Sequence, residues 1–222
     1  MGHRRVMPAD PSSGTARQRD VLELIATLLL AVAAVATAWS SYQATRWNGE
    51  QVRASSRTTA LRIEAARAAD LADSQTEIDV ATFIQWIDAT ANGDDELAQF
   101  YAARFRPEFE PAFEAWLATD PLNDPAAPPT PFAMDEYQLA ARADAADLDR
   151  QSEASAAIVL RNVRRSADFV LAVVLFAASL FFAGISTKVD RMALRAATLG
   201  IGCLLFLGTV VWVATLPMIV GT

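Results

Sequence analysis

Residues 21–42 read VLELIATLLLAVAAVATAWSSY, and this apolar run indicates the fold class of the chain. An α-helix needs about 20 apolar residues to cross the hydrocarbon core of a membrane, and this stretch has that length with Glu23 as its only charge. Stretches of this kind hold much of the 53% hydrophobic content of the 222 residues, which argues against a single soluble globule. We therefore predict a first transmembrane helix at 21–43.

Both ends of this stretch carry residue types that favour a membrane interface. Arg17 and Arg19 precede it, at the end of a basic N-terminal segment that we assign to residues 1–20. Amphipathic aromatic rings lie at the other end, at Trp39, Tyr42 and Trp47. Arginines before an apolar run that contains Ala36-Thr37-Ala38 are also typical of a cleaved signal peptide. We expect an uncleaved anchor instead.

Two further apolar runs follow near the end of the chain. The first, FVLAVVLFAASLFFAGIS, predicts a transmembrane helix at 168–186, and the second predicts another at 196–220. Residues 187–195 lie between them as a short basic turn, so the two helices are expected to be antiparallel neighbours in the membrane. Cys203, in the last run, is interpreted as a small packing residue.

The positive charges predict the orientation of the chain in the membrane. The N-terminal segment and the turn carry seven of them, at Arg4, Arg5, Arg17, Arg19, Lys188, Arg191 and Arg195. Six more flank the middle segment, residues 44–167, at Arg46, Arg53, Arg57, Arg161, Arg164 and Arg165. Because a loop of this length crosses a membrane largely regardless of its charge, we expect the N-terminus in the cytoplasm and residues 44–167 outside.

The composition limits what the middle segment can do. Residues 44–167 contain 12 Arg and 21 Asp plus Glu, a net charge of −9, whereas the whole chain has −7. A negative surface repels nucleic acid, so we expect no nucleic-acid partner. The chain has one His and one Cys, too few for a His/Cys metal site, a Ser-His-Asp triad or a disulfide framework within one chain.

The middle segment is predicted to be helical nearly throughout. Ala, Leu, Arg, Glu and Gln dominate residues 44–167, and no alternating β-branched run occurs. The first helix is expected to continue out of the membrane and to end at Asn92-Gly93, which is a typical stop signal. A shorter helix is expected from Asp94 or Asp95, because acidic side chains suit the start of a helix.

Prolines and their absence predict the remaining helices. We expect a helix to end at Arg106 and the next to start near Pro107. The return helix is expected from Ala133 or Met134 and to run without a break into the second membrane helix. The predicted fold class is therefore all-α, with three transmembrane helices and a long antiparallel helical hairpin and head between the first and the second.

Four aromatic residues in the middle segment are spaced by four, four and three, so they share one helical face if the helix tolerates Pro111. They are Phe105, Phe109, Phe113 and Trp116. We interpret them as the core of the head or as a partner surface, with a ligand groove as the alternative. Phe83, Ile84 and Ile87 are expected to pack against them. The loop at 119–131, which has five prolines, is expected to wrap the head.

Arg161, Arg164 and Arg165 lie on one side of the return helix, just before the second span. They are candidate contacts for lipid phosphate or for the acids of a neighbouring subunit. Ordinary anchoring at the membrane interface is the alternative. The same candidate set of lipid or subunit contacts includes the aromatic residues Trp39, Tyr42 and Trp47.

Several stretches resemble an uncharacterised family of bacterial three-span membrane proteins. The matching pieces are ATAWSSYQATRW (36–47), ATFIQWIDA (81–89), RPEFEPAFEAWLATDPLNDPAAPP (106–129) and VLFAASLFFAGISTK (174–188). The resemblance covers most of the chain. It implies a bacterial inner-membrane location and a helical domain between spans one and two. It implies no activity, cofactor or active residue.

The first functional hypothesis is an oligomeric structural or interaction module that presents its head to a protein partner. A seam of small residues along the first span, spaced alternately by four and three, would let helices of several copies approach closely. This seam consists of Thr27, Ala31, Ala34, Ala38, Ser41 and Thr45. Other registers of small residues look similar, among them Ala26, Ala33 and Thr37.

The alternative is a subunit of an oligomeric ion channel or transporter. Glu23 is the candidate acid of a pore or an interface, although it can also reach back to the interface near Arg19. An enzyme is the weakest hypothesis, because no phosphate loop, nucleophile elbow or metal motif accompanies the carboxylates of the chain. We expect no cofactor.

Overall fold

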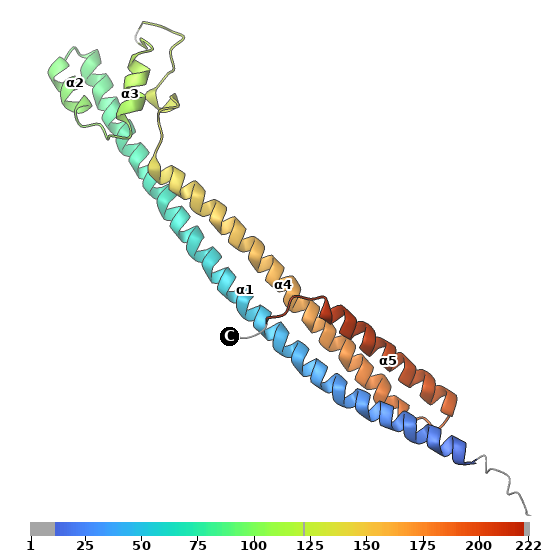
Figure 1. Cartoon of the computed structure of the whole chain (residues 1–222). Coiled ribbons are helices and arrows are strands. Elements are labelled where there is room, and N and C mark those ends of the chain that lie inside the picture. The colour runs from blue at the N-terminus through green and yellow to red at the C-terminus, as the bar shows by residue number, and fades with distance from the viewer. Residues whose placement is uncertain (1–11, 122, 220–222) are drawn as a thin grey trace, which may run out of the picture. The chain divides into compact units, whose positions relative to one another are not determined.

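A computed structural model describes residues 12–121 and 123–219, with side chains from Gln18 onward. Of the described residues, 81% are helical and none lies in a strand. The elements are α1 (Ser12–Ala91), α2 (Asp95–Ala102), α3 (Glu110–Leu117), the 3₁₀ turn η1 (Pro131–Ala133), α4 (Ala140–Ser186) and α5 (Met192–Ala214) (Figure 1). The predicted all-α class is confirmed. Most of the predicted basic segment at 1–20, with Arg4 and Arg5, lies outside the described residues.

Three of these helices, α1, α4 and α5, are long and apolar enough to cross a membrane, as the sequence predicted. The third differs from its predicted bounds of 196–220, because α5 starts at Met192 and ends at Ala214. The helix cannot continue through Pro217, which has no N–H to donate to the preceding turn. The predicted turn at 187–195 is correspondingly shorter, and Arg195 lies within α5.

The chain divides into two units, which we describe separately. The apolar unit consists of Met1–Arg53 and Ile158–Thr222, and the acidic unit consists of Ala54–Ala157. The acidic unit begins ten residues later and ends ten residues earlier than the predicted domain at 44–167. It has 7 Arg and 20 Asp plus Glu, a net charge of −13, whereas the apolar unit has 12 Lys plus Arg and 6 acids, a net charge of +6.

In the apolar unit, parts of α1, α4 and α5 pack side by side (Figure 1). The buried residues are small side chains interspersed with phenylalanines, such as Ala26, Ala33, Phe169 and Phe176. Helices α4 and α5 approach so closely that the hydroxyl of Ser179 donates to the Gly202 carbonyl at 2.8 Å. A Cβ on that glycine would lie only 3.3 Å from the Ser179 carbonyl oxygen. Close approach of this kind is typical of helices that pack in membranes.

The face of α1 that packs within the apolar unit is not the predicted seam. Ala26 and Ala33, from one of the alternative registers, are completely buried. All six residues of the predicted seam are exposed: Thr27, Ala31, Ala34, Ala38, Ser41 and Thr45. One step along a helix is a rotation of about 100°, so a register shifted by one residue lies on a different face. Because alanine occurs on every face of α1, the sequence does not show which register is buried.

In the acidic unit, α1 and α4 run antiparallel. The hydroxyl of Thr58 on α1 donates to the hydroxyl of Ser155 on α4 at 2.9 Å. Farther along α1, Thr76 lies 3.4 Å from an Arg142 nitrogen, near the start of α4. Small buried side chains such as Ala72 let the two helices approach. The segment from 91 to 140 then connects them.

The predicted end of α1 and start of α2 are confirmed. Helix α1 ends at Ala91, and Gly93 follows with φ of +72°, a left-handed conformation that glycine adopts at low cost. The N–H of Asp94 donates to the Ala89 carbonyl at 3.0 Å, which satisfies the helix end. Asp94 also caps α2, because its carboxylate accepts from the Leu97 N–H at 3.0 Å.

The helix boundaries around the prolines differ from the prediction. Helix α2 ends at Ala102 rather than at Arg106, and α3 starts at Glu110 with Pro111 in its first turn, where a missing N–H costs little. The return helix starts at Ala140, not at Ala133 or Met134. Tertiary contacts explain the delay, because Leu139 is buried against α1 and the preceding residues turn back toward the core.

Candidate functional site

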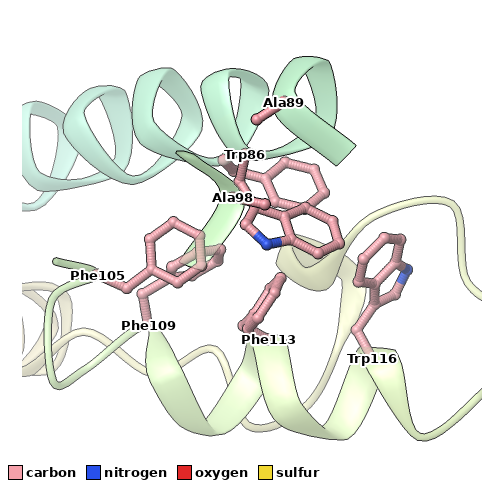
Figure 2. Close-up of a cluster of buried hydrophobic side chains, with 8 residues drawn as sticks. Trp86, Ala89, Ala98, Phe105, Phe109, Phe113 and Trp116 are labelled. Atoms are coloured by element: carbon pink, nitrogen blue, oxygen red, sulfur yellow. The ribbon is translucent and has the colours of Figure 1, made fainter. Parts of the chain in front are cut away.

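The largest cluster of buried side chains lies in the acidic unit and is mainly aromatic (Figure 2). Its buried members are Phe83, Trp86, Ala89, Ala98, Phe105, Phe109, Phe113 and Trp116. The ring centroids of Phe105 lie 4.9 Å from those of Phe109 and 4.8 Å from those of Phe113. Trp86 meets Phe113 edge to face at 4.9 Å. Such aromatic pairs contribute about 0.5–1.5 kcal/mol each beyond the area that they bury.

All four aromatic residues singled out in the sequence therefore lie together in a core, and none of them is a surface residue. Figure 2 shows the Phe113 and Trp116 side chains rising from α3 toward Trp86 on α1. The expected partners on α1 are only partly correct. Phe83 packs against the cluster, but Ile84 and Ile87 are exposed, because Trp86 is the next residue on the buried face of the helix.

The proline-rich loop is attached to this cluster. The indole N–H of Trp116 donates to the Pro128 carbonyl at 2.8 Å. Phe132, which follows the loop, stacks on Phe109 with 5.1 Å between ring centroids. The loop is thus held by side chains of the core at both of these points.

A buried ionic network lies beside the aromatic cluster, and sequence reasoning missed it. Asp79 on α1 is completely buried. Its Oδ2 accepts from the Arg106 guanidinium at 2.9 Å and from the Tyr137 hydroxyl at 3.0 Å. Arg106 also pairs with Glu108, whose other oxygen accepts from the Ala140 N–H at 3.1 Å. The network therefore ties α1 to the turn before α3 and to the first residue of α4.

The environment of Asp79 changes the pKa of its carboxyl group. Burial raises the pKa of Asp79 above its ordinary value of 3.8, and this effect exceeds the lowering by the Tyr137 hydrogen bond and the Arg106 charge. Burial likewise raises the pKa of the Tyr137 hydroxyl. The second oxygen of Asp79, Oδ1, is buried and has no hydrogen-bond partner among the described residues. A proton on that carboxyl group is the change in charge that this site can undergo.

One signal in the sequence points to Asp79. It lies seven residues after Ala72 and four before Phe83, both of which are buried, so it falls on the inward face of α1. The surrounding acidity made it look like one more solvated carboxylate. Arg106 and Glu108 gave no comparable signal, because a partner 27 residues away in the sequence is invisible to spacing.

Arginine and aromatic side chains meet where the apolar stretch of α1 ends. The Arg165 guanidinium lies 4.5 Å from the Trp47 ring centroid, and Arg46 lies 6.0 Å from that of Tyr42. Trp39 and Tyr42 pack at 5.8 Å and are both exposed. Arg161 and Arg164 extend into solvent. The six predicted lipid or subunit contacts thus lie in the apolar unit, on α1 and α4.

The C-terminal segment is joined to the same part of α1. The indole N–H of Trp47 donates to the Pro217 carbonyl at 3.2 Å. The Gln43 side chain makes two hydrogen bonds to the backbone of Ile219, accepting from its N–H at 3.1 Å and donating to its carbonyl at 3.3 Å. This pairing satisfies a buried amide and holds the residues that follow α5.

Glu23, the candidate pore or interface acid, lies beside a positive charge. Its carboxylate is 3.7 Å from the Arg195 guanidinium, and its side chain is 68% exposed. The positive charge of Arg195 therefore offsets the negative charge of Glu23, which the pore hypothesis needs to attract cations. The described residues contain no group of three His, Cys, Asp or Glu side chains placed to hold a metal ion.

Helix α2 leaves two large apolar side chains on the surface. Leu97 is 40% and Phe100 48% exposed, and both line a shallow hollow together with Asp94 and Glu96. The Arg104 guanidinium lies 3.5 Å from the Phe100 ring centroid. The helix is attached to the aromatic cluster through Ala98, which is buried.

No protein-family model, no curated protein and no solved structure matches this chain. The proposals below therefore rest on the arrangement of its own residues.

Proposed function

We propose that this protein is a multi-pass bacterial inner-membrane module that acts by interaction and presents its acidic unit, as an extracytoplasmic head, to a protein partner. The proposal includes a cytoplasmic N-terminus and assembly of several copies. Its three long apolar helices support membrane insertion. The antiparallel course of α1 and α4 in the acidic unit supports a hairpin that carries a head.

The exposed surface of α2 is the observation that best supports an interaction function. Leu97 and Phe100 form an apolar patch, and Asp94 and Glu96 border it. Large apolar side chains that are ringed by charge are typical of protein-contact sites. The acids predict the chemistry of the partner. We propose a basic, amphipathic helix whose apolar side chain contacts Phe100 and whose Lys or Arg residues pair with the acids of α2.

Assembly of several copies has support from α1. The predicted seam of small residues, from Thr27 to Thr45, is exposed in the single chain, so it is available to a helix of a second copy. The Thr27 and Thr45 hydroxyls bond to carbonyls of their own helix, so close packing against them leaves no polar group without a partner. The channel alternative has no comparable support, because Glu23 lies beside Arg195.

The partner surface can be tested with photo-crosslinking in intact cells. A photoreactive residue at Leu97 or Phe100 is expected to give one discrete adduct. The matched control is the same residue at Leu117, which is exposed to a similar degree on α3. Reversing the acids with Asp94→Lys and Glu96→Lys is expected to abolish the adduct. Equal adducts at all three positions, or an adduct that survives the charge reversal, would contradict the proposal.

A further inference from the structure

A group of arginines in the apolar unit lies level with the end of the membrane-spanning stretches. The Ser166 hydroxyl on α4 donates to the Ala44 carbonyl on α1 at 3.1 Å, which fixes the register of the two helices. Arg165 consequently faces Trp47 across the contact. Arg161, Arg164 and Arg165 therefore lie on neighbouring turns of α4 close to this contact, and Arg46 precedes Trp47 on α1.

None of these four arginines forms an ion pair among the described residues of the unit. Arg161 and Arg165 are four residues apart on a helix and share a face, where like charges repel. Asp168 follows three residues after Arg165, yet no ion pair joins them among the described residues. The four arginines are thus arranged to accept an anion from outside the chain.

One of the guanidinium groups is already ordered before an anion binds. Arg165 lies over the Trp47 ring, and that ring is itself fixed by its hydrogen bond to Pro217. A guanidinium that stacks on an aromatic face keeps its edge N–H groups free, and these groups match two oxygens of a phosphate. A side chain that is already ordered loses less conformational entropy when the anion binds.

The surface next to the arginines selects a lipid over a free ion. Directly after them, α4 exposes Val170, Leu171 and Val174, which a phosphate ion would not contact. A phospholipid would place its phosphate on the guanidinium groups and its acyl chains along these side chains. We propose that Arg161, Arg164 and Arg165, with Arg46, form a binding site for the headgroup of an anionic phospholipid.

Native mass spectrometry of the full chain in detergent tests this site. The probes are dioleoylphosphatidylglycerol and dioleoylphosphatidylcholine, which share acyl chains and differ in net charge. We expect the anionic lipid to bind more tightly. The triple variant Arg161→Gln, Arg164→Gln, Arg165→Gln is expected to lose affinity for it by about fivefold per arginine. The matched control, Arg62→Gln, Arg67→Gln, Arg150→Gln, removes three exposed arginines from the acidic unit and is expected to change nothing.

Two further arms make the outcome decisive. A Lys triple variant at the same three positions retains the positive charge. We expect it to keep the preference for the anionic lipid, which would show that the glutamine variant loses affinity because it loses charge. Inorganic phosphate at millimolar concentration should not displace the lipid. Equal binding of the two lipids, equal loss in the control triple, or displacement by inorganic phosphate would each overturn the proposal.

Discussion

The apolar and acidic units are built on the same two helices, yet they are held together differently. In the apolar unit, α1 and α4 pack with α5 through small side chains, the buried Phe169 and Phe176, and a close Ser179–Gly202 contact. In the acidic unit, the Thr58–Ser155 hydrogen bond joins α1 to α4, while an aromatic cluster and the buried Asp79–Arg106 pair join α1 to α2, α3 and the turn before α3. Burying an extended cluster of rings removes apolar area from water, whereas helices that cross a membrane, as we propose for the apolar unit, gain more from close approach, because lipid tails are themselves apolar. Each unit thus relies on the interaction that its proposed surroundings would favour.

The largest effect on stability is expected from Phe109→Ala, which tests whether the aromatic cluster stabilises the acidic unit. Phe109 is completely buried, so its loss should destabilise that unit by about 3–5 kcal/mol. The matched control is Phe100→Ala, since Phe100 is half exposed on α2. Thermal unfolding followed by near-UV circular dichroism would measure both. If the two variants unfold alike, the cluster does not have this role.

A smaller loss is expected from Asp79→Ala. The substitution removes one partner of a buried ion pair, which typically lowers the free energy of unfolding by about 3–5 kcal/mol. Because Arg106 keeps its ion pair with Glu108, we expect a loss of about 3 kcal/mol here. Denaturant unfolding of the full chain in detergent is the measurement. The double variant with Arg106→Ala should lose less than the sum of the two single variants. Simple additivity would show that the pair makes no contribution of its own.

The next prediction concerns the apolar unit, where hydrogen bonds from Gln43 hold the segment after α5. Gln43→Ala removes two hydrogen bonds to Ile219, which together contribute roughly 1–3 kcal/mol. Hydrogen exchange in the peptide that contains Ile219 should become faster by about tenfold or more. Asn48→Ala, at an exposed position on α1, is the control and should leave that rate unchanged. Unchanged exchange in both variants would mean that Gln43 does not hold the segment.

The smallest effect is a pH dependence confined to the acidic unit. The folded state raises the pKa of Asp79 above 3.8, so the folded state binds a proton more readily than the unfolded state. The stability that Asp79 contributes to the folded state is therefore fully present below pH 3.8 and is lost as the pH rises through the raised pKa. Its charged or titratable neighbours are Arg106, Glu108 and Tyr137.

Asp79→Asn removes the titrating group and should flatten this part of the curve of stability against pH. The measurement is the melting temperature of the acidic unit at a series of pH values above 3.8. Asp147→Asn, on the exposed face of α4, serves as the control, because the pKa of Asp147 is lowered by hydrogen bonds from Gln151 and Arg150. Its contribution has the opposite sign and is lost as the pH falls. A wild-type slope that survives Asp79→Asn would assign the effect to another group.

Much of the fold could be predicted because it depends on local pattern. Apolar runs of sufficient length predicted α5 and the apolar parts of α1 and α4. Asn92-Gly93 predicted the end of α1. The four aromatic residues from Phe105 to Trp116 share a core, but not the single helical face that their spacing predicted, because Phe105 lies in the turn before α3. The start of α4 was missed by several residues, because contacts of Tyr137 and Leu139 with α1 override helix propensity there.

The sequence by itself determined the helices, the three apolar stretches and the separation of charge, since length, periodicity and composition act over a few neighbouring residues. Only the tertiary structure decided which face of α1 is buried, because several alanine registers are equivalent in sequence. It also decided that Asp79 meets Arg106 and that Arg165 meets Trp47. Those partners lie far apart along the chain, and only the packing of the helices determines which side chains come within reach of each other.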